Sequence, residues 1–455
     1  MNFAFFLERF FKLKEAGTTI KTEFVAGVTT FMTMAYIIFV QPTILSKCGM
    51  DFDAVMTATC LASALACFLM AVLANYPIAL APAMGHNVYF AFVACPIISA
   101  ILGNKSTVEP WQVALGAIFI SGIIFVIFSS LELRERVIEA IPLSLRNAIA
   151  VGIGLLIAFI GFEWSGVTAT HPVTYVTLGK LNTPPVLLSI FGLFAISSLL
   201  VLRVKGAILV GMFLTACMGF ASGIIHYKGT VSAIPSISPT FMKLSFKGAF
   251  SIGFLELIFV FFFLDLFDTV GTLVGIGEKG GFIKNNGFPR VKQALLSDAS
   301  ATCVGAILGT STVTSYVESA AGISQGGKTG LSNIVTGIFM IAALFFKPLV
   351  AMIGTGYEQD GVYLYPVIAP ALIIVGCMMM GCVKKIEWDD YTEAIPSFLT
   401  IVVMPFCGFS ITEGISFGFI SYAILKLISG KRRELHPLLL AFSALFILRY
   451  TYLMF

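Results

Sequence analysis

The chain has 455 residues, of which 58% are hydrophobic and 11% are charged, and its formal net charge is +4. Its mean hydropathy is +0.96, and this balance excludes an ordinary soluble globular protein. Because the basic residues lie in loops between apolar runs, we expect no nucleic-acid partner. Successive runs of about 20 apolar residues can each cross a ~30 Å hydrocarbon core, so the sequence predicts an all-α polytopic protein of the lipid bilayer.

The chain begins with residues 1–23, a basic and amphipathic segment whose apolar run is too short for a signal peptide. This pattern predicts an interfacial segment on the cytoplasmic side. At the other end, residues 431–455 predict a tail with an interfacial helix from His436 onward. Fourteen spans are predicted between these segments, at 24–45, 53–76, 78–101, 112–131, 141–165, 184–202, 206–226, 251–276, 291–309, 311–326, 331–354, 363–383, 393–409 and 411–429.

Basic residues gather at the N-terminus and in the loops that follow even-numbered spans. This asymmetry predicts a multi-pass protein of the inner (cytoplasmic) membrane with a cytoplasmic N-terminus. The longer loop after the seventh span also carries lysines, but long loops weigh less in orientation. The basic residues of the even loops are Arg134, Arg136, Arg203, Lys205, Lys279, Lys284, Arg290, Lys292, Lys384, Lys385, Lys431, Arg432 and Arg433.

Two spans are interrupted by residues that disfavour a continuous helix. The third span contains Pro82, Gly85, His86 and Asn87, and the tenth contains Glu318 among small polar residues. Interrupted spans in matching places of two halves indicate the binding site of a transporter. The first and eighth spans begin about 230 residues apart, and this offset places Asn87 beside Glu318. The sequence therefore predicts a 7+7 inverted repeat, since seven is odd, with short extended segments in spans three and ten.

The eighth span carries Asp265 and Asp268 among phenylalanines and leucines. An acid in mid-span costs ~2.5–3.5 kcal/mol on insertion scales, so these acids and Glu318 need a partner or a function. A spacing of three residues puts Asp265 and Asp268 on one helix face. A purely structural role stays open for each acid, as does a simple interhelical hydrogen bond for Asn87.

Structural roles are predicted for Asp298 and for the cysteines. Asp298, near the predicted start of the ninth span, is expected to cap a helix or to bond between helices. The nine cysteines show no metal-binding spacing and their number is odd, which predicts buried free thiols. We expect no metal site and no cofactor.

Four stretches carry a resemblance to a known family: ALAPAMGHNVYFAF, FFFLDLFDTVGTLVG, GTSTVTSYVESAAGISQGGKTGL and GISFGFISYAILKL. They resemble the azaguanine-type purine permeases of the nucleobase–cation symporter-2 (xanthine/uracil permease) family, and the similarity runs over nearly the whole chain. The resemblance implies a core domain, residues 24–131 and 251–354. It also implies a gate domain, residues 132–250 and 355–430, against which the core domain rocks.

The resemblance further implies that the extended segments of spans three and ten hold a purine base, with Asn87, Asp265 and Glu318 as its ligands. A carboxylate accepts from a purine N–H, and an amide both donates and accepts. Phe90 and Phe262 could stack on the ring. A carboxyl group in a dry site can take up and release a proton as access alternates. The candidates for proton coupling are Asp265, Asp268, Glu318 and His86.

Two other classes of protein fit parts of the sequence: an ATP-driven pump, and an anion exchanger or channel. Residues 322–329, GISQGGKT, fit a phosphate-loop pattern and would suggest an ATP-driven pump. That pattern has meaning only between a strand and a helix of a soluble unit, and the chain leaves no soluble domain of ~100–200 residues. An anion exchanger or channel with the same interrupted helices also stays open, although three acids favour a neutral or cationic substrate.

The sequence thus predicts a secondary active transporter, not an enzyme. It would import adenine, guanine or hypoxanthine by proton symport with alternating access. The sequence leaves open which base is preferred, whether Na⁺ replaces H⁺, and whether two copies form a homodimer.

Overall fold

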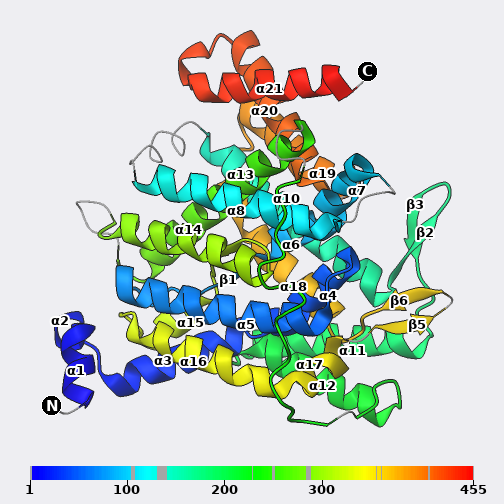
Figure 1. Cartoon of the computed structure of the whole chain (residues 1–455). Helices are drawn as coiled ribbons and strands as arrows, with labels where there is room; N and C mark the ends of the chain where they lie inside the picture. The colour runs from blue at the N-terminus through cyan, green and yellow to red at the C-terminus, as the bar shows by residue number, and fades with distance from the viewer. Residues whose placement is uncertain are drawn as a thin grey trace. The chain divides into compact units, whose positions relative to one another are not determined.

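A computed structural model describes residues 3–103, 108–130, 141–227, 229–247, 252–282, 288–354, 356–359, 361–407 and 410–453. These residues are mostly helical, as Figure 1 shows. Within the described residues, nine helices are long and apolar enough to cross a membrane, and three shorter apolar helices accompany them. The predicted class, an α-helical polytopic membrane protein, is confirmed.

The first half of the chain follows the predicted order of spans. Its helices are α1 (Phe3–Phe10), α2 (Leu13–Ala16), α3 (Ile20–Met34), α4 (Ile37–Leu45), η1 (Ser46–Cys48), α5 (Phe52–Leu69), η2 (Met70–Ala74), α6 (Met84–Tyr89), η3 (Phe90–Ala94), α7 (Cys95–Leu102), α8 (Pro110–Ser130), α10 (Leu143–Ser165), α11 (Pro184–Val201) and α12 (Ala207–Ala221). Its strands are β1 (Leu80–Pro82), β2 (Thr168–His171) and β3 (Tyr175–Leu178).

The second half repeats this order, with a long helix, a second helix, and then a strand followed by a short helix. Its helices are α13 (Ile252–Lys279), α14 (Val291–Leu308), α15 (Ser319–Ile323), α16 (Leu331–Ala343), η4 (Leu344–Phe346), α17 (Lys347–Gly354), α18 (Ala369–Met379), η5 (Met380–Lys385), α19 (Tyr391–Phe406), α20 (Ile411–Ile428), η6 (Arg432–Glu434) and α21 (Pro437–Leu453). Its strands are β4 (Val313–Ser315), β5 (Tyr357–Gln359) and β6 (Val362–Leu364).

The chain divides into two compact units. One comprises Met1–Ser130 and Phe162–Ala371, and the other comprises Leu131–Gly161 and Leu372–Phe455. Within the first unit, α16 packs against α3 and α5, and α14 packs against α5 and α8, so these helices lie side by side in Figure 1. The predicted division into core and gate domains stays a prediction.

Spans three and ten both contain the extended segment that the sequence predicts. Strands β1 and β4 pair antiparallel, with Leu80 opposite Ser315 and Pro82 opposite Val313. The Ala83 amide donates to the carbonyl oxygen of Thr312 at 3.0 Å, which extends the pairing by one bond. Proline disfavours the helical conformation of the residue before it, and β-branched residues favour a strand, so the local sequence supports the extended form. An antiparallel pair made from equivalent spans is the relation expected of inverted halves.

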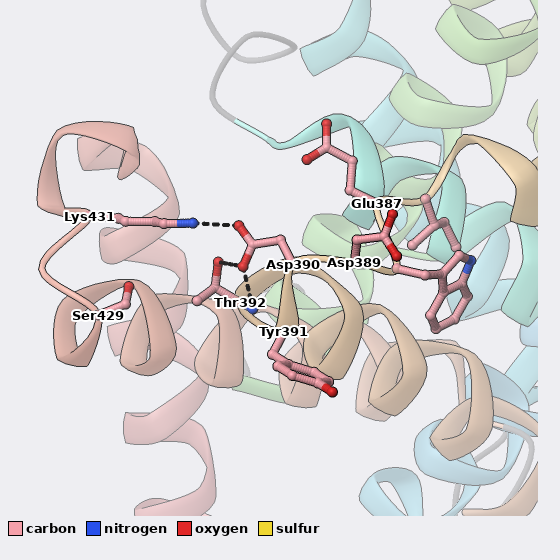
Figure 2. Close-up of a pocket in the computed structure, with 9 residues that line it drawn as sticks. Glu387, Asp389, Asp390, Tyr391, Thr392, Ser429 and Lys431 are labelled. Carbon is pink, nitrogen blue, oxygen red and sulfur yellow. Dashed lines mark hydrogen bonds and ion pairs between the residues drawn. The ribbon is translucent and has the colours of Figure 1, made fainter.

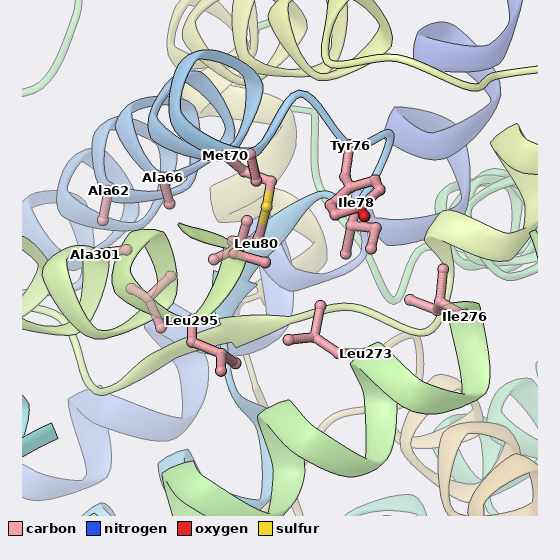
Figure 3. Close-up of a cluster of buried hydrophobic side chains, with 13 residues drawn as sticks. Ala62, Ala66, Met70, Tyr76, Ile78, Leu80, Leu273, Ile276, Leu295 and Ala301 are labelled. Carbon is pink, nitrogen blue, oxygen red and sulfur yellow. The ribbon is translucent and has the colours of Figure 1, made fainter. Parts of the chain in front are cut away.

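An apolar cluster surrounds these two strands and fixes their position (Figure 3). Alanines and a methionine recur every four residues along α5 and η2, and small side chains of this kind let neighbouring elements approach closely. Helices α13 and α14 contribute the other sides of the cluster. Its buried members are Ala62, Ala66, Met70, Ala74, Tyr76, Ile78, Leu80, Leu273, Ile276, Ala294, Leu295, Ala301 and Val313.

The second unit is built on the hairpin of α19 and α20. A Cβ on Gly418 would lie 2.0 Å from the hydroxyl oxygen of Thr400, so glycine permits the close approach of these helices. Helix α21 runs back along α20, because the Ser443 hydroxyl lies 3.0 Å from the carbonyl oxygen of Phe419 and Arg449 pairs with Glu413 at 2.8 Å. The interfacial placement of residues 431–455 stays a prediction.

Three local features differ from what the sequence predicts or were not foreseen. The twelfth span was expected from residue 363, but residues 362–364 form β6 and the helix begins only at Ala369. The hairpins β2–β3 and β5–β6 were not expected, because their short strands carry little hydrophobic periodicity. Cys48 and Cys95 form a disulfide, so the prediction of buried free thiols fails for this pair; the seven other cysteines are free, but only Cys60 and Cys67 are buried.

Gly330 and Gly275 provide a matched test of the packing in the first unit. A Cβ on Gly330 would lie 2.5 Å from the carbonyl oxygen of Ala71, whereas a Cβ on Gly275 would meet nothing within 4 Å. We expect Gly330→Ala to lower the apparent melting temperature of the solubilised protein, since overpacking destabilises by ~1–3 kcal/mol. Gly275→Ala should keep or raise it, since alanine is favoured over glycine in a helix by ~1 kcal/mol. Equal melting temperatures in a heating series read by size-exclusion chromatography would contradict this close contact.

Candidate functional site

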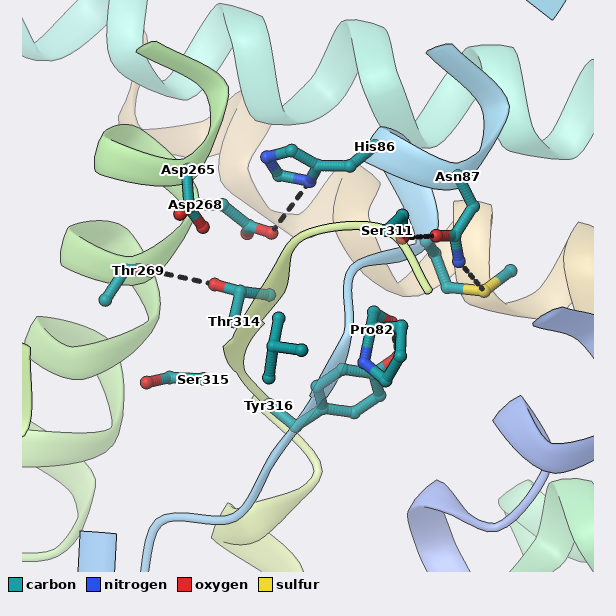
Figure 4. Close-up of polar contacts among 12 residues, drawn as sticks. Pro82, His86, Asn87, Asp265, Asp268, Thr269, Ser311, Thr314, Ser315 and Tyr316 are labelled. Atoms are coloured by element: carbon teal, nitrogen blue, oxygen red, sulfur yellow. Dashed lines mark hydrogen bonds and ion pairs between the residues drawn. The ribbon is translucent and has the colours of Figure 1, made fainter. Parts of the chain in front are cut away.

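Polar side chains from α6, α13 and β4 converge where the two strands pair (Figure 4). His86 and Asn87 lie on α6, and Asp265 and Asp268 lie on α13. Glu318 comes directly before α15 and occupies its N-cap position without a side-chain capping bond. The structure therefore brings the polar residues predicted from the sequence into one region of the first unit.

Asp268 and His86 face each other across this region. The imidazole Nδ1 of His86 lies 3.9 Å from Oδ2 of Asp268, and Figure 4 shows the ring directed toward the carboxylate. The His86 side chain is 2% exposed, whereas the Asp268 side chain is 35% exposed. An imidazole beside a carboxylate can exchange a proton with it, so this pair has the chemistry that proton coupling requires.

Glu318 is held by a residue that the sequence analysis missed. The Tyr36 hydroxyl, at the junction of α3 and α4, donates to Oε1 of Glu318 at 2.7 Å. The Thr33 hydroxyl lies 3.4 Å from the main-chain oxygen of the same residue. The Tyr36 side chain is buried, while Glu318 remains partly exposed. A tyrosine in an apolar span is a weak sequence signal, because most such residues simply pack.

Asn87 belongs to a second polar link between spans one, three and ten. Its carboxamide oxygen accepts a hydrogen bond from Ser311, and the side-chain amide of Gln41 donates to Ser311 at 3.2 Å and to Thr310 at 2.8 Å. Asn87 and Gln41 are both fully buried. Gln41 was also missed, since a single amide in a hydrophobic run has no pattern around it.

Asp265 is fully buried, and its carboxylate contacts Thr302, a residue that supports strand β4. Its Oδ2 lies 3.1 Å from the hydroxyl of Thr302. That hydroxyl also accepts from the amide of Val313 at 3.2 Å and lies 2.9 Å from its carbonyl oxygen. The substrate-binding role expected for Asp265 stays a prediction, and its contact with Thr302 fits a residue that positions the strand.

Asp298 lies in the interior of α14 and not at its start. Arg290 occupies the N-cap position of that helix, so the expectation of a capping role is wrong. The fully buried carboxylate of Asp298 accepts from Thr269 at 2.7 Å and from Ser315 at 3.2 Å. It thereby ties β4 to α13, which confirms the expected bond between helical elements.

The two predicted stacking residues are buried among other rings. Phe90 is 0% exposed and its ring centroid lies 6.5 Å from that of Phe261. Phe262 packs edge-on against Phe125 and Phe128 of α8, at 6.1 and 5.1 Å. These contacts are those of helix packing, and stacking on a ligand stays a prediction for both residues.

Comparisons with known proteins identify the family of the chain. Residues 21–417 match the model of the xanthine/uracil permeases, described as "Permease family". The chain belongs to this permease family.

The relatives of the permease are similar over their full length. A putative permease of Methanocaldococcus jannaschii is 46% identical over 98% of this chain and 99% of its own. The adenine permease AdeP of Escherichia coli is 42% identical, over 98% and 96% of the two chains. The guanine/hypoxanthine permease PbuO of Bacillus subtilis is also 42% identical, over 96% and 99%. The permease is therefore a multi-pass membrane transporter and not an enzyme.

Solved structures show the same fold in proteins of distant sequence. The transmembrane domain of the cyanobacterial bicarbonate transporter BicA has a TM-score of 0.63 at 15% identity, covering 85% of this chain and 96% of that domain. SLC26A9 has a TM-score of 0.62 at 9% identity, covering 90% and 66%. At this identity the likeness concerns the fold alone.

The phosphate-loop pattern at residues 322–329 has a different role in the permease. It connects α15 to α16 and does not follow a strand in a nucleotide-binding unit. The fully buried carboxylate of Glu23 accepts from the Lys328 amide at 2.9 Å. The main-chain N–H of Lys328, which a phosphate-binding loop would offer to a phosphate, is thus already bonded to Glu23 of the same chain.

A pocket of about 900 Å³ lies in the second unit, at the start of α19 (Figure 2). Asp390 caps that helix through the Thr392 amide at 2.9 Å and pairs with Lys431 at 2.5 Å. The hydrogen bonds from Lys431 and Thr392 hold the pKa of Asp390 well below its usual range. These charged groups stabilise a helix end of the second unit, whereas the residues of the candidate site belong to the first unit.

Tyr36 provides a test of the site that sequence reasoning did not suggest. We expect Tyr36→Phe to raise the KM for the transported solute about tenfold, because a hydrogen bond to a charged group contributes ~1.5 kcal/mol. The maximal rate and the melting temperature should change little. Tyr227→Phe is the matched control, since Tyr227 is 59% exposed. An unchanged KM in initial-rate uptake by Tyr36→Phe would show that Tyr36 does not orient Glu318 for binding.

Proposed function

We propose that the permease imports purine nucleobases by proton symport. The observation that carries this proposal is the proximity of two partly exposed acids to polar partners, Asp268 to His86 and Glu318 to Tyr36, beside the paired strands. Relatives 42% identical over nearly the whole chain are named adenine and guanine/hypoxanthine permeases. A purine is a planar neutral ligand whose N–H groups suit carboxylate acceptors.

Exposure divides the four acids of this region into two kinds. Asp265 and Asp298 are 0% exposed and bond to hydroxyls that support β4. The Asp268 side chain is 35% exposed, and Glu318 is partly exposed. A ligand reaches a carboxylate only where other groups leave it accessible. We assign Glu318 to the purine N–H and Asp268, together with His86, to the coupling proton.

The anion exchanger is the second candidate, because the fold is also that of a bicarbonate transporter. A site for an anion needs donors or positive charge facing the ligand. Asp268 and Glu318 instead present two acids at the accessible positions of this region. These acids disfavour an inorganic anion and favour a neutral base that arrives with a cation.

The orientation belongs to the same proposal. Basic loops after even-numbered spans support a cytoplasmic N-terminus in the inner membrane. In this orientation, the ends of the first and third spans, near residues 48 and 102, lie on the outer side.

Substrate class is tested by competition for uptake in transport-deficient cells. Excess unlabelled adenine, guanine or hypoxanthine should block the uptake of a labelled purine, and a protonophore should abolish accumulation. Replacing Na⁺ by choline should leave uptake unchanged. Sulfate and bicarbonate serve as controls and should not compete; competition by these anions alone would assign the protein to the exchangers.

The roles of the acids are separated by two conservative variants. Glu318→Gln replaces an acceptor oxygen with a donor, and an unpaired donor costs ~1–3 kcal/mol, so purine affinity should fall about five- to 150-fold. Asp268→Asn should still bind purine and exchange it across the membrane, but should not accumulate it against a gradient. The measurements are calorimetric binding and pH-driven uptake in proteoliposomes.

Glu358→Gln on the exposed hairpin β5–β6 is the matched control and should behave as the unaltered protein. Normal binding by Glu318→Gln, or uphill accumulation by Asp268→Asn, would contradict the proposed assignment.

A further inference from the structure

We infer that the Cys48–Cys95 disulfide is a clamp near the outer ends of spans one and three that holds the part of span three carrying the candidate site against span one. The two cysteines are bonded and their Cα atoms lie 6.2 Å apart, within the usual range. Cys48 is the last residue of η1, and Cys95 is the first residue of α7. This role goes beyond the proposed transport activity. It depends on the proposed function only for the orientation of the chain in the membrane.

The clamp lies close in sequence to residues of the candidate site on both spans. Cys95 comes eight residues after Asn87, and η3 lies between them. Cys48 comes seven residues after Gln41. Gln41 and Asn87 both bond Ser311, so the disulfide is a second link between the same two spans.

The segment between Asn87 and Cys95 contains an irregular helical turn that such a link would stabilise. Residues 90–94 form a π-helical turn, in which the regular helical hydrogen bonds are interrupted. An interruption of this kind permits a shift in register between the helical pieces on either side. A covalent bond at the C-terminal end of the turn opposes that shift and keeps α6 in place beside the strands.

An aromatic cluster adjoins the clamp on the same side. The ammonium group of Lys47 lies 4.7 Å from the ring centroid of Tyr365, 5.7 Å from that of Tyr363 and 5.9 Å from that of Trp164. The Phe92 ring packs against Trp164 at 6.5 Å. The residues on either side of the clamp thus bind to hairpin β5–β6 and to the end of α10. Cys95 is buried, while Cys48 is partly exposed and open to attack by a reductant.

The chemistry of the clamp is oxidation of two thiols. The Cys48 and Cys95 thiols lose two protons and two electrons as the S–S bond forms. A disulfide-bearing oxidant of the outer compartment accepts the electrons and is reduced to a dithiol. Such bonds persist in oxidising compartments, which agrees with the proposed outer location.

The bond itself is tested by counting thiols. Protein purified without reductant is denatured and alkylated with iodoacetamide, and its intact mass is measured. We expect seven alkylated cysteines before reduction and nine after it, given seven free cysteines and one disulfide. Cys48→Ser/Cys95→Ser should give seven in both states, and the control Cys217→Ser should give six and eight. Nine alkylated cysteines before reduction would overturn the inference.

The clamping role is tested with a membrane-impermeant phosphine reductant on right-side-out and inverted vesicles. In right-side-out vesicles the reductant should lower the melting temperature by roughly 5 °C, because the bond closes a long loop, and should raise the KM several-fold. Cys48→Ser/Cys95→Ser should show both defects without reductant and no further change with it.

A double variant that melts and transports normally would refute the clamp. An effect of the reductant only in inverted vesicles would refute the outer location. The thiol count and melting temperature do not depend on the transported solute, so these results remain separate from any failure of the purine proposal.

Discussion

The structure depends on how two interrupted spans satisfy their main-chain hydrogen bonds within a membrane. An unpaired N–H or C=O in hydrocarbon costs several kcal/mol, so an extended segment needs partners at the same depth. Strands β1 and β4 supply these partners to each other. Side chains complete the pairing: Ser319 accepts from the Ala79 amide at 2.9 Å, and Asn333 donates to the carbonyl oxygen of Ile78 at 2.6 Å. The surrounding helices must leave room for two strands, which explains the alanines along α5.

This requirement also explains why acids occur so deep in the first unit. The carboxylates of Asp265 and Asp298 accept hydrogen bonds from threonine and serine hydroxyls. These hydroxyls support strand β4, which faces the site. Their burial resembles that of Glu23, which binds the main chain before α16. Asp265, Asp298 and Glu23 thus stabilise irregular backbone, whereas Asp268 and Glu318 beside the paired strands are accessible to a ligand.

The same scaffold serves proteins that carry different substrates. The likeness to BicA concerns the arrangement of helices and strands, while the identity is 15%. Function on a shared fold depends on the side chains at the site. In this permease, accessible acids with tyrosine and histidine partners lie where the strands pair.

The sequence by itself determined the membrane class, the succession of many apolar helices, and the interruption of spans three and ten. Hydropathy and helix breakers are local properties, and an acid in an apolar run is conspicuous wherever it folds. For that reason Asp268, Glu318 and Asn87 could be predicted as candidates. The bonding partners of Asp298 could not, since Thr269 and Ser315 lie on other elements of the fold.

Only the tertiary structure decided which partner each of these groups has. Tyr36 and Glu318 are 282 positions apart, and Gln41 and Ser311 are 270 apart. Cys48 and Cys95 gave no sign of pairing in an odd set of cysteines. A hydrogen bond or disulfide depends on distance and direction in space, and neither is encoded in the residues next to either partner. The candidates were therefore predictable one by one, whereas their division into supporting and accessible acids arose only when the spans packed together.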